Sequence, residues 1–402
     1  MKFTYTVRTK KGEVEKGEME ASSKDEAANL LGQKNLTPIA IIKHSGLNIS
    51  LSSINALAPV PRVEKVVFSR QLSTLVNAGV PLVQSLGILE KQTSNPKMKS
   101  TVGEVLHDVE GGSSLSEALK KHPKTFNAVF VNLVHAGEVG GVLDQTLERL
   151  ADQIEKDHEI VSKVRGAMMY PAVITVAMVA AVLFMMVSII PQLADMFEEM
   201  NAQLPMSTKI LIAVSKALTT YGIITFSVII ASVFLFRYSV KKIYGVRKKF
   251  HFFLLHIPVL GKMTKKINIT RFTRTLGTLM ASGISVIEAL NIVADATSNT
   301  LFKEEIKEAA KKVKDGVPIS ASLDKSKNFP ALVSQMIAVG EETGTLSDIL
   351  LKISSFYDKE IDNTIKNLTS LLEPLLMILI GGMIGFVMVS IIKPIYQLTN
   401  MF

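Results

Sequence analysis

The chain has 402 residues, 48% of them hydrophobic, and a formal net charge of +9. Its mean hydropathy of +0.30 is too high for one soluble domain of this length. Cysteine is absent, which excludes disulfides, thiolate metal sites and cysteine nucleophiles.

The first 45 residues predict a small module that is separate from the rest of the chain. KFTYTVRT and EVEKGEMEA alternate on either side of Lys11-Gly12, as in a β-hairpin, and TPIAIIK from Thr37 predicts a further strand. With a helix between the hairpin and the strand from Thr37, residues 1–45 are expected to form a ββαβ unit. A linker that contains Ser, Asn and Pro follows over 46–62. A small unit on a tether is more often a docking module than an enzyme.

Two stretches of the chain repeat each other. FSRQLSTLVNAGVPLVQSL from Phe68 aligns with FTRTLGTLMASGISVIEAL from Phe272, with seven identities in 19 positions. GEVGGVLDQTL from Gly137 aligns in the same order with GEETGTLSDIL from Gly340. Apolar residues at helical spacing and Gly- or Pro-containing breaks predict an all-helical bundle in each copy, over 63–168 and 266–371.

Three stretches of 19 uncharged residues predict membrane-spanning helices: Ala172 to Ile190, Leu218 to Phe236 and Pro374 to Ile392. At about 1.5 Å per residue each reaches about 28 Å, close to the ~30 Å hydrocarbon thickness. With their flanks the spans take 169–191, 218–236 and 372–393. The remaining segments are then a loop over 192–217, a basic connector over 237–265 and a tail over 394–402. The predicted fold is mainly α and polytopic.

The basic connector predicts the orientation of the chain. From Arg237 to Lys266 there are nine Lys or Arg residues and no acidic residue. The positive-inside rule therefore places this segment, both bundles and the amino terminus in the cytoplasm, and the carboxyl terminus outside. Because both copies then run from the cytoplasm outward, the second span serves to return the chain. The position of the connector beside a span favours attraction to anionic lipid over binding of nucleic acid.

The motif search predicts no catalytic residue, cofactor or metal site. The sequence contains no G-x-x-x-x-G-K-[ST] phosphate loop and no H-E-x-x-H or G-x-S-x-G motif. Gly137-Glu138 and Gly340-Glu341 predict a helix-ending glycine followed by a turn. Glu138 and Glu341 then either bind a cation or partner there, or accept hydrogen bonds from amides of the turn, and the second alternative is favoured.

The start of the third span carries an ionisable residue, Glu373, beside Pro374. The aligned residues in the first copy are Tyr170 and Pro171. An acidic side chain at membrane depth is a functional candidate. The alternative is a hydrated carboxylate at the membrane interface.

Two further pairs of residues are candidates for structural roles. Arg70 and Arg274 occupy aligned positions, and a salt bridge within each bundle is favoured over a partner contact. Gly381 and Gly385 form a small-xxx-small face in the third span, which predicts close packing against another helix.

These blocks resemble the F family of type II secretion systems, which includes the inner-membrane platform proteins of type IV pilus assembly. The resemblance covers essentially the whole chain and includes HIPVLGKMTKKINITRFTRTLGTLMASGISVIEAL, GEETGTL and LLEPLLMILIGGMIGFVMVSIIKPIYQ. It implies a multi-pass inner-membrane component that forms homo-oligomers. It also implies contact with a hexameric secretion ATPase, with pilin or pseudopilin subunits and with other inner-membrane assembly proteins.

A subunit of a small-substrate membrane transporter is the alternative function. Repeats and an intramembrane acid occur in transporters as well. Three spans with few polar residues besides Thr and Ser argue against it.

Overall fold

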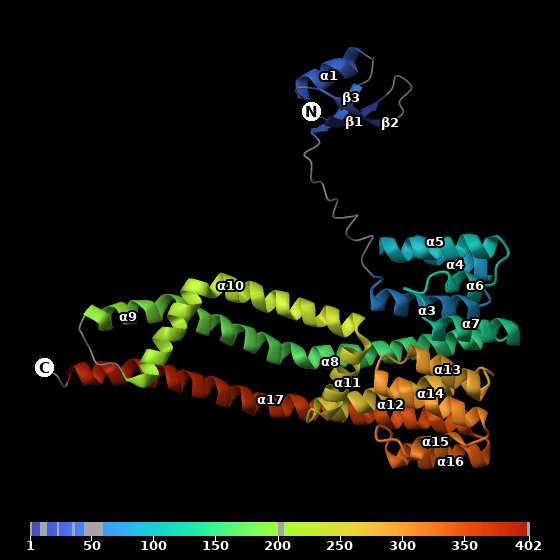
Figure 1. The fold of residues 1–402 in the computed structure, drawn as a ribbon. Coiled ribbons are helices and arrows are strands. Elements are labelled where there is room, and N and C mark those ends of the chain that lie inside the picture. The colour runs from blue at the N-terminus through green and yellow to red at the C-terminus, as the bar shows by residue number, and fades with distance from the viewer. Residues whose placement is uncertain are drawn as a thin grey trace. The chain divides into compact units, whose positions relative to one another are not determined.

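The computed structural model describes residues 2–8, 14–21, 24–33, 37–43, 59–199 and 205–399. The chain divides into two units, Met1–Pro59 and Val60–Phe402. The predicted linker lies largely outside the described residues. Overall the chain is mainly helical (Figure 1).

The first unit contains β1 (Lys2–Arg8), β2 (Val14–Glu20), α1 (Lys24–Gln33) and β3 (Thr37–Lys43). β1 is the central strand of an antiparallel sheet with the order β2-β1-β3. Val7 of β1 and Leu31 of α1 are both buried, so the helix contributes to the core of this small unit.

The second unit contains the same series of six helices twice. The first copy comprises α3 (Arg62–Asn77), α4 (Leu82–Gln92), α5 (Pro96–Glu110), α6 (Leu115–Lys120), α7 (Ala128–Gly140) and α8 (Leu143–Phe184). The second comprises α12 (Leu260–Ala281), α13 (Val286–Ala296), α14 (Thr300–Lys314), α15 (Ile319–Asp324), α16 (Ala331–Thr343) and α17 (Leu346–Thr399). The helices correspond in order, and the segment between α15 and α16 is one residue shorter than that between α6 and α7.

Glycines in the left-handed region end matching helices in the two copies. Gly79 (φ 79°) and Gly283 (φ 85°) follow α3 and α12, while Gly141 (φ 68°) and Gly344 (φ 69°) follow α7 and α16. A side chain strains this backbone conformation, and glycine removes that cost. One of the predicted Gly- or Pro-containing breaks is confirmed at Gly79-Val80-Pro81, because α3 ends before these residues and α4 begins after them.

The two copies share one hydrophobic core. Leu72 and Leu276 occupy aligned positions on α3 and α12, and both are fully buried. Aromatic rings pack in the interior of each copy. The ring centroids of Phe68 and Phe126 are 5.5 Å apart in the first copy, and those of Phe272 and Phe329 are 5.0 Å apart in the second. Burying such side chains stabilises the fold by about 1.5–3 kcal/mol each.

Three helices are long and apolar enough to span a membrane, as predicted. The first is α8 with its continuation through a π-helical turn, η1 (Met185–Ile189), into α9 (Ile190–Glu199). The second is α10 (Met206–Lys242), and the third is α17. Figure 1 shows α8, α10 and α17 extending from one side of the helical bundles.

Helices occupy parts of both segments that connect the candidate spans. Within the predicted loop over 192–217, α9 continues to Glu199 and α10 begins at Met206, and α11 (Tyr244–His256) lies in the basic connector. The helices therefore extend beyond the 19 uncharged residues that predict each of the first two spans. Charged residues end membrane burial, but they do not end a helix that continues beyond it.

Helices α8 and α17 pack together between the bundles and their apolar portions. Ile160 of α8 lies in a small cluster with Ile361 and Ile365 of α17, and all three are buried. Lys163 donates to both carboxylate oxygens of Asp362 at 2.9 Å. The two long helices are therefore joined to each other as well as to their own bundles.

Candidate functional site

The carboxylate of Glu138 binds the amino-terminal end of another helix. Its Oε1 accepts from the Leu115 amide at 2.5 Å and its Oε2 from the Ser116 amide at 3.2 Å. These amides begin α6, where the backbone N–H groups lack partners within the helix and the helix dipole favours a negative charge. Glu138 therefore joins α7 to α6.

Glu341 makes the same connection in the second copy. Its Oε1 accepts from the Ile319 amide at 2.5 Å, and its Oε2 accepts from the Ser320 amide at 3.2 Å and from the Ser320 hydroxyl. Hydrogen bonding to amides was the favoured prediction, but the predicted amides were those of the turn that follows. The partners instead begin a helix far earlier in the chain, so the carboxylate stabilises tertiary structure.

Gly137 and Gly340 lie inside α7 and α16 rather than at their ends. A Cβ atom at Gly137 would lie 2.8 Å from Cβ of Thr146, and one at Gly340 would lie 3.0 Å from Cα of Leu346. Contacts this short require the neighbouring helix to move. Both glycines therefore allow α7 and α16 to approach the start of the long helix that follows.

Arg70 forms a salt bridge from α3 to α8 within the first copy. It donates to Glu155 at 2.7 and 2.6 Å and to Asp152 at 2.5 Å. The guanidinium lowers the pKa of the Glu155 carboxyl by hydrogen bonding. The Arg70 side chain is 36% exposed, so solvent screens this cluster.

Arg274 forms the matching bridge in the second copy but is buried. Its Nη2 donates to Asp358, the residue aligned with Glu155, and only 7% of its side chain is exposed. Its Nη1 lies 3.9 Å from Asp157 of the first copy. Thus Arg274 both ties α12 to α17 and contributes charge across the boundary between the copies.

The candidates at the membrane boundary are exposed. Glu373 has no ion pair or hydrogen bond within the described part of the chain, and Tyr170 at the aligned position is 57% exposed. Helices α8 and α17 continue through Pro171 and Pro374. The structure therefore leaves Glu373 and Tyr170 accessible to lipid, water or another protein.

The small-residue face of α17 has no neighbour within the described chain. A Cβ at Gly381 or Gly385 would meet nothing within 4 Å. The predicted close packing is therefore not made intramolecularly.

Polar contacts at the boundary between the copies were missed by the sequence analysis. Gln153 of α8 donates to the Thr275 hydroxyl of α12 at 3.0 Å, and Arg271 lies 3.4 Å from Asp157. Arg149 donates to the Ala281 carbonyl. An alignment of the two copies draws attention to residues that are identical in both. These contacts are made by residues that differ between the copies.

The described residues bring together no group of three His, Asp or Glu side chains suited to holding a metal ion. Their main polar arrangements are the two Glu-to-helix contacts, the two Arg clusters and the boundary between the copies. These arrangements position helices.

Comparison with known proteins agrees with this organisation. The family described as type II secretion system (T2SS), protein F, matches twice, at residues 68–191 and 272–394, and the N-terminal domain of that protein matches residues 1–42. The type IV pilus assembly protein PilC of Myxococcus xanthus is 36% identical over 398 residues, covering 99% of this chain and 95% of the relative. The type II secretion system protein F of Xanthomonas campestris is 33% identical over 401 residues, covering 99% and 98% respectively.

The double match coincides with the two helical copies, each including the apolar part of its long last helix. The three candidate spans and this family point to an inner-membrane protein of a secretion or pilus assembly machine. The chain belongs to the type II secretion system protein F family.

Proposed function

We propose that this protein is the platform that couples a cytoplasmic secretion ATPase to the movement of pilin or pseudopilin subunits. The observation that carries the proposal is the continuity of α8 and α17 from the helical bundles into the apolar spans. A stiff helix transmits a rotation or tilt from one end to the other. The absence of a phosphate loop from the sequence supports an external source of energy.

The packing of α8 against α17 supports this coupling. The buried isoleucines and the Lys163–Asp362 pair lie between the bundles and the spans. A displacement of one bundle would therefore move both helices together. The amino-terminal ββαβ module and the bundle surfaces are the proposed docking sites for the ATPase.

We place the bundles and the amino terminus in the cytoplasm and the carboxyl terminus outside. The composition of α11 supports this orientation, because Arg247 and Lys249 accompany the exposed aromatic side chains of Phe252 and Phe253. Cations combined with aromatic residues suit the interface of an anionic membrane.

Reporter fusions test this orientation. Fusions at residues 120 and 310 should report a cytoplasmic location, and a fusion at residue 205 should report the outside. An outside signal at residue 310 would contradict the parallel arrangement of the two copies.

Glu373 is the proposed contact with the membrane-embedded part of a pilin subunit. Its carboxylate is exposed and has no protein partner in the described chain, although it lies in a helix that enters an apolar span. A positively charged or hydrogen-bonding group on a pilin would compensate the cost of holding the carboxylate near lipid. The exposed Gly381 face of the same helix is proposed to pack against a pilin or a second copy of this chain.

Glu373→Gln tests the proposed contact in cells that assemble pili or secrete. We expect fibre assembly or secretion to fall by about tenfold, as for the loss of one charged contact, with protein level and ATPase recruitment unchanged. Tyr170→Phe, at the aligned position, is the matched control and should leave assembly unchanged. Normal assembly with Gln at position 373 would remove this residue from the mechanism, and ATP hydrolysis by the purified protein alone would overturn the platform role.

The transporter alternative makes a different prediction for the same purified protein. In liposomes a transporter subunit would pass ions or small solutes, whereas a platform protein would not. The exposure of Glu373 favours the platform, because acidic residues of transporters face a bundle interior or a water-filled cavity.

A further inference from the structure

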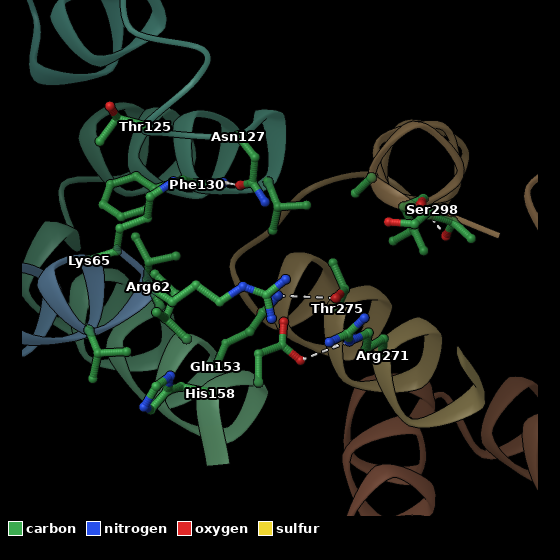
Figure 2. Close-up of a pocket in the computed structure, with 18 of the residues that line it drawn as sticks. Arg62, Lys65, Thr125, Asn127, Phe130, Gln153, His158, Arg271, Thr275 and Ser298 are labelled. Atoms are coloured by element: carbon green, nitrogen blue, oxygen red, sulfur yellow. Dashed lines mark hydrogen bonds and ion pairs between the residues drawn. The ribbon is translucent and has the colours of Figure 1, made fainter. Parts of the chain in front are cut away.

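A cavity of about 290 Å³ lies between the two helical copies. Helices α3, α7 and α8 of the first copy and α12 and α13 of the second contribute its lining (Figure 2). Three cationic side chains, Arg62, Lys65 and Arg271, line it, with Asp157 as the single carboxylate. The volume is near the lower end for small-molecule sites, about 300–1,000 Å³.

Two of these cations have no anionic partner in the described chain. Arg62 makes no ion pair or hydrogen bond there, and Lys65 donates only to the Lys124 carbonyl, at 3.3 Å. Burial lowers the pKa of Lys65, and the nearby charge of Arg62 lowers it further. Arg62 is exposed and Lys65 is half-buried, so the open side of the cavity carries an excess of positive charge to which an anion from solution has access.

The second copy shows how such a cation is neutralised in this fold. Lys266 aligns with Arg62, and it pairs with Glu360 at 2.8 Å. Asp157 aligns with Glu360 but faces Arg271 of the other copy, at 3.4 Å. The carboxylate that would correspond to the partner of Lys266 therefore pairs with Arg271 of the second copy and not with Arg62. Figure 2 shows its guanidinium reaching across the cavity toward that second copy.

The position of Lys65 shows that the fold does not require a cation there. The aligned residue in the second copy is Ile269, which is 1% exposed. An apolar side chain is therefore compatible with this position of the helix. The lysine adds charge to the cavity without adding an ion pair within the described residues.

Two buried polar atoms near the cations lack hydrogen-bond partners within the described residues. Gln153 is 7% exposed and donates to Thr275, but its Oε1 accepts no hydrogen bond within the described chain. Nδ1 of His158 is also buried without a partner among the described residues. Both residues line the cavity. Both atoms have almost no solvent-accessible surface, so a group on a ligand would reach them only after the Gln153 or His158 side chain turns toward the cavity.

The rest of the wall is mixed, and its polar side chains are those of Thr125, Asn127, Asn268, Thr297 and Ser298. Phe130, Val129 and Ile154 of the first copy and Val293 of the second line the cavity. These apolar side chains suit the non-ionic part of an organic ligand.

We propose that the cavity binds a small organic phosphate, with the phosphate near Arg62, Lys65 and Arg271 and the non-ionic part of the ligand against the apolar side chains of the wall. Guanidinium and ammonium groups together are the usual partners of phosphate oxygens. Because the ligand would touch both copies, its binding would fix their relative positions. This inference is independent of the proposed coupling to an ATPase.

Calorimetric titration of the full chain in phosphatidylcholine nanodiscs, with EDTA present, tests the proposal. Adenosine diphosphate and inorganic pyrophosphate should bind, and adenosine should not. Arg62→Ala and Lys65→Met should each weaken the Kd by about tenfold or more, as expected for the loss of a charged contact. Lys91→Met, at an exposed lysine of α4, is the matched control and should leave the Kd unchanged.

Several outcomes would overturn the assignment. One is the absence of saturable binding of both phosphates, and another is an equal loss of affinity in the Lys91 control. Unchanged binding in both cavity variants, with their unfolding transitions intact, would place the ligand elsewhere. Retention of phosphatidylglycerol that depends on Arg62, without binding of adenosine diphosphate, would identify a lipid headgroup in place of a free phosphate.

Discussion

Arg274→Met should destabilise the helical bundles by about 3 kcal/mol, whereas Arg70→Met should cost about 1 kcal/mol or less. The two arginines occupy aligned positions and each bridges to the long helix of its own copy. They differ in burial, since 7% of the Arg274 side chain is exposed against 36% for Arg70. Removing the buried guanidinium of Arg274 leaves Asp358 without this partner, and one oxygen of that carboxylate is buried. Water can take the place of the more exposed guanidinium of Arg70.

Pulse proteolysis of the detergent-solubilised full chain in increasing urea measures this difference. The midpoint for Arg274→Met should fall well below that of the unsubstituted protein, and the midpoint for Arg70→Met should lie close to it. Arg274→Met combined with Asp358→Leu should recover part of the loss, because it removes the unpaired carboxylate. Equal midpoints for the two single variants would show that burial does not determine the strength of these bridges.

Much of the helical repeat could be predicted from the sequence because its signals are local. Apolar spacing and the Gly79 turn mark the individual helices, and uncharged length marks the three spans. The order of these signals recurs in the second copy, so the duplication is evident from the sequence alone.

The partners of the candidate residues could not be predicted in the same way. Arg70 was correctly expected to form a bridge within its bundle, but nothing local indicates that Glu155 is its partner. The location of Glu138 in the GEVGG segment suggested that the nearest amides would donate hydrogen bonds to its carboxylate. Tertiary packing instead places the amides at the start of α6 beside it. The contact between α6 and α7 depends on how the intervening chain folds, which periodicity does not describe.

The contacts at the boundary between the copies could not be predicted from the sequence for a different reason. A repeat alignment treats Asp157 and Glu360 as equivalents, yet one pairs across the boundary and the other pairs within its own copy. Two copies in one chain occupy different surroundings, so aligned residues acquire different partners. The cavity arises from this asymmetry and not from any motif.

Glu341→Gln should destabilise the second copy by about 2–4 kcal/mol. The carboxylate accepts two amide hydrogen bonds from the start of α15, and hydrogen bonds to a charged group contribute about 1.5–3 kcal/mol each. A glutamine of the same shape keeps one acceptor but directs its NH₂ group at a backbone N–H, and it removes the negative charge that the helix dipole favours.

The neighbouring exposed residue supplies the matched control: Glu342→Gln should leave the urea midpoint of pulse proteolysis unchanged. Glu138→Gln should reproduce the loss in the first copy, because its contacts with α6 have the same geometry. A stable Glu341→Gln protein would mean that water satisfies these amides and that the carboxylate is retained for contact with a partner.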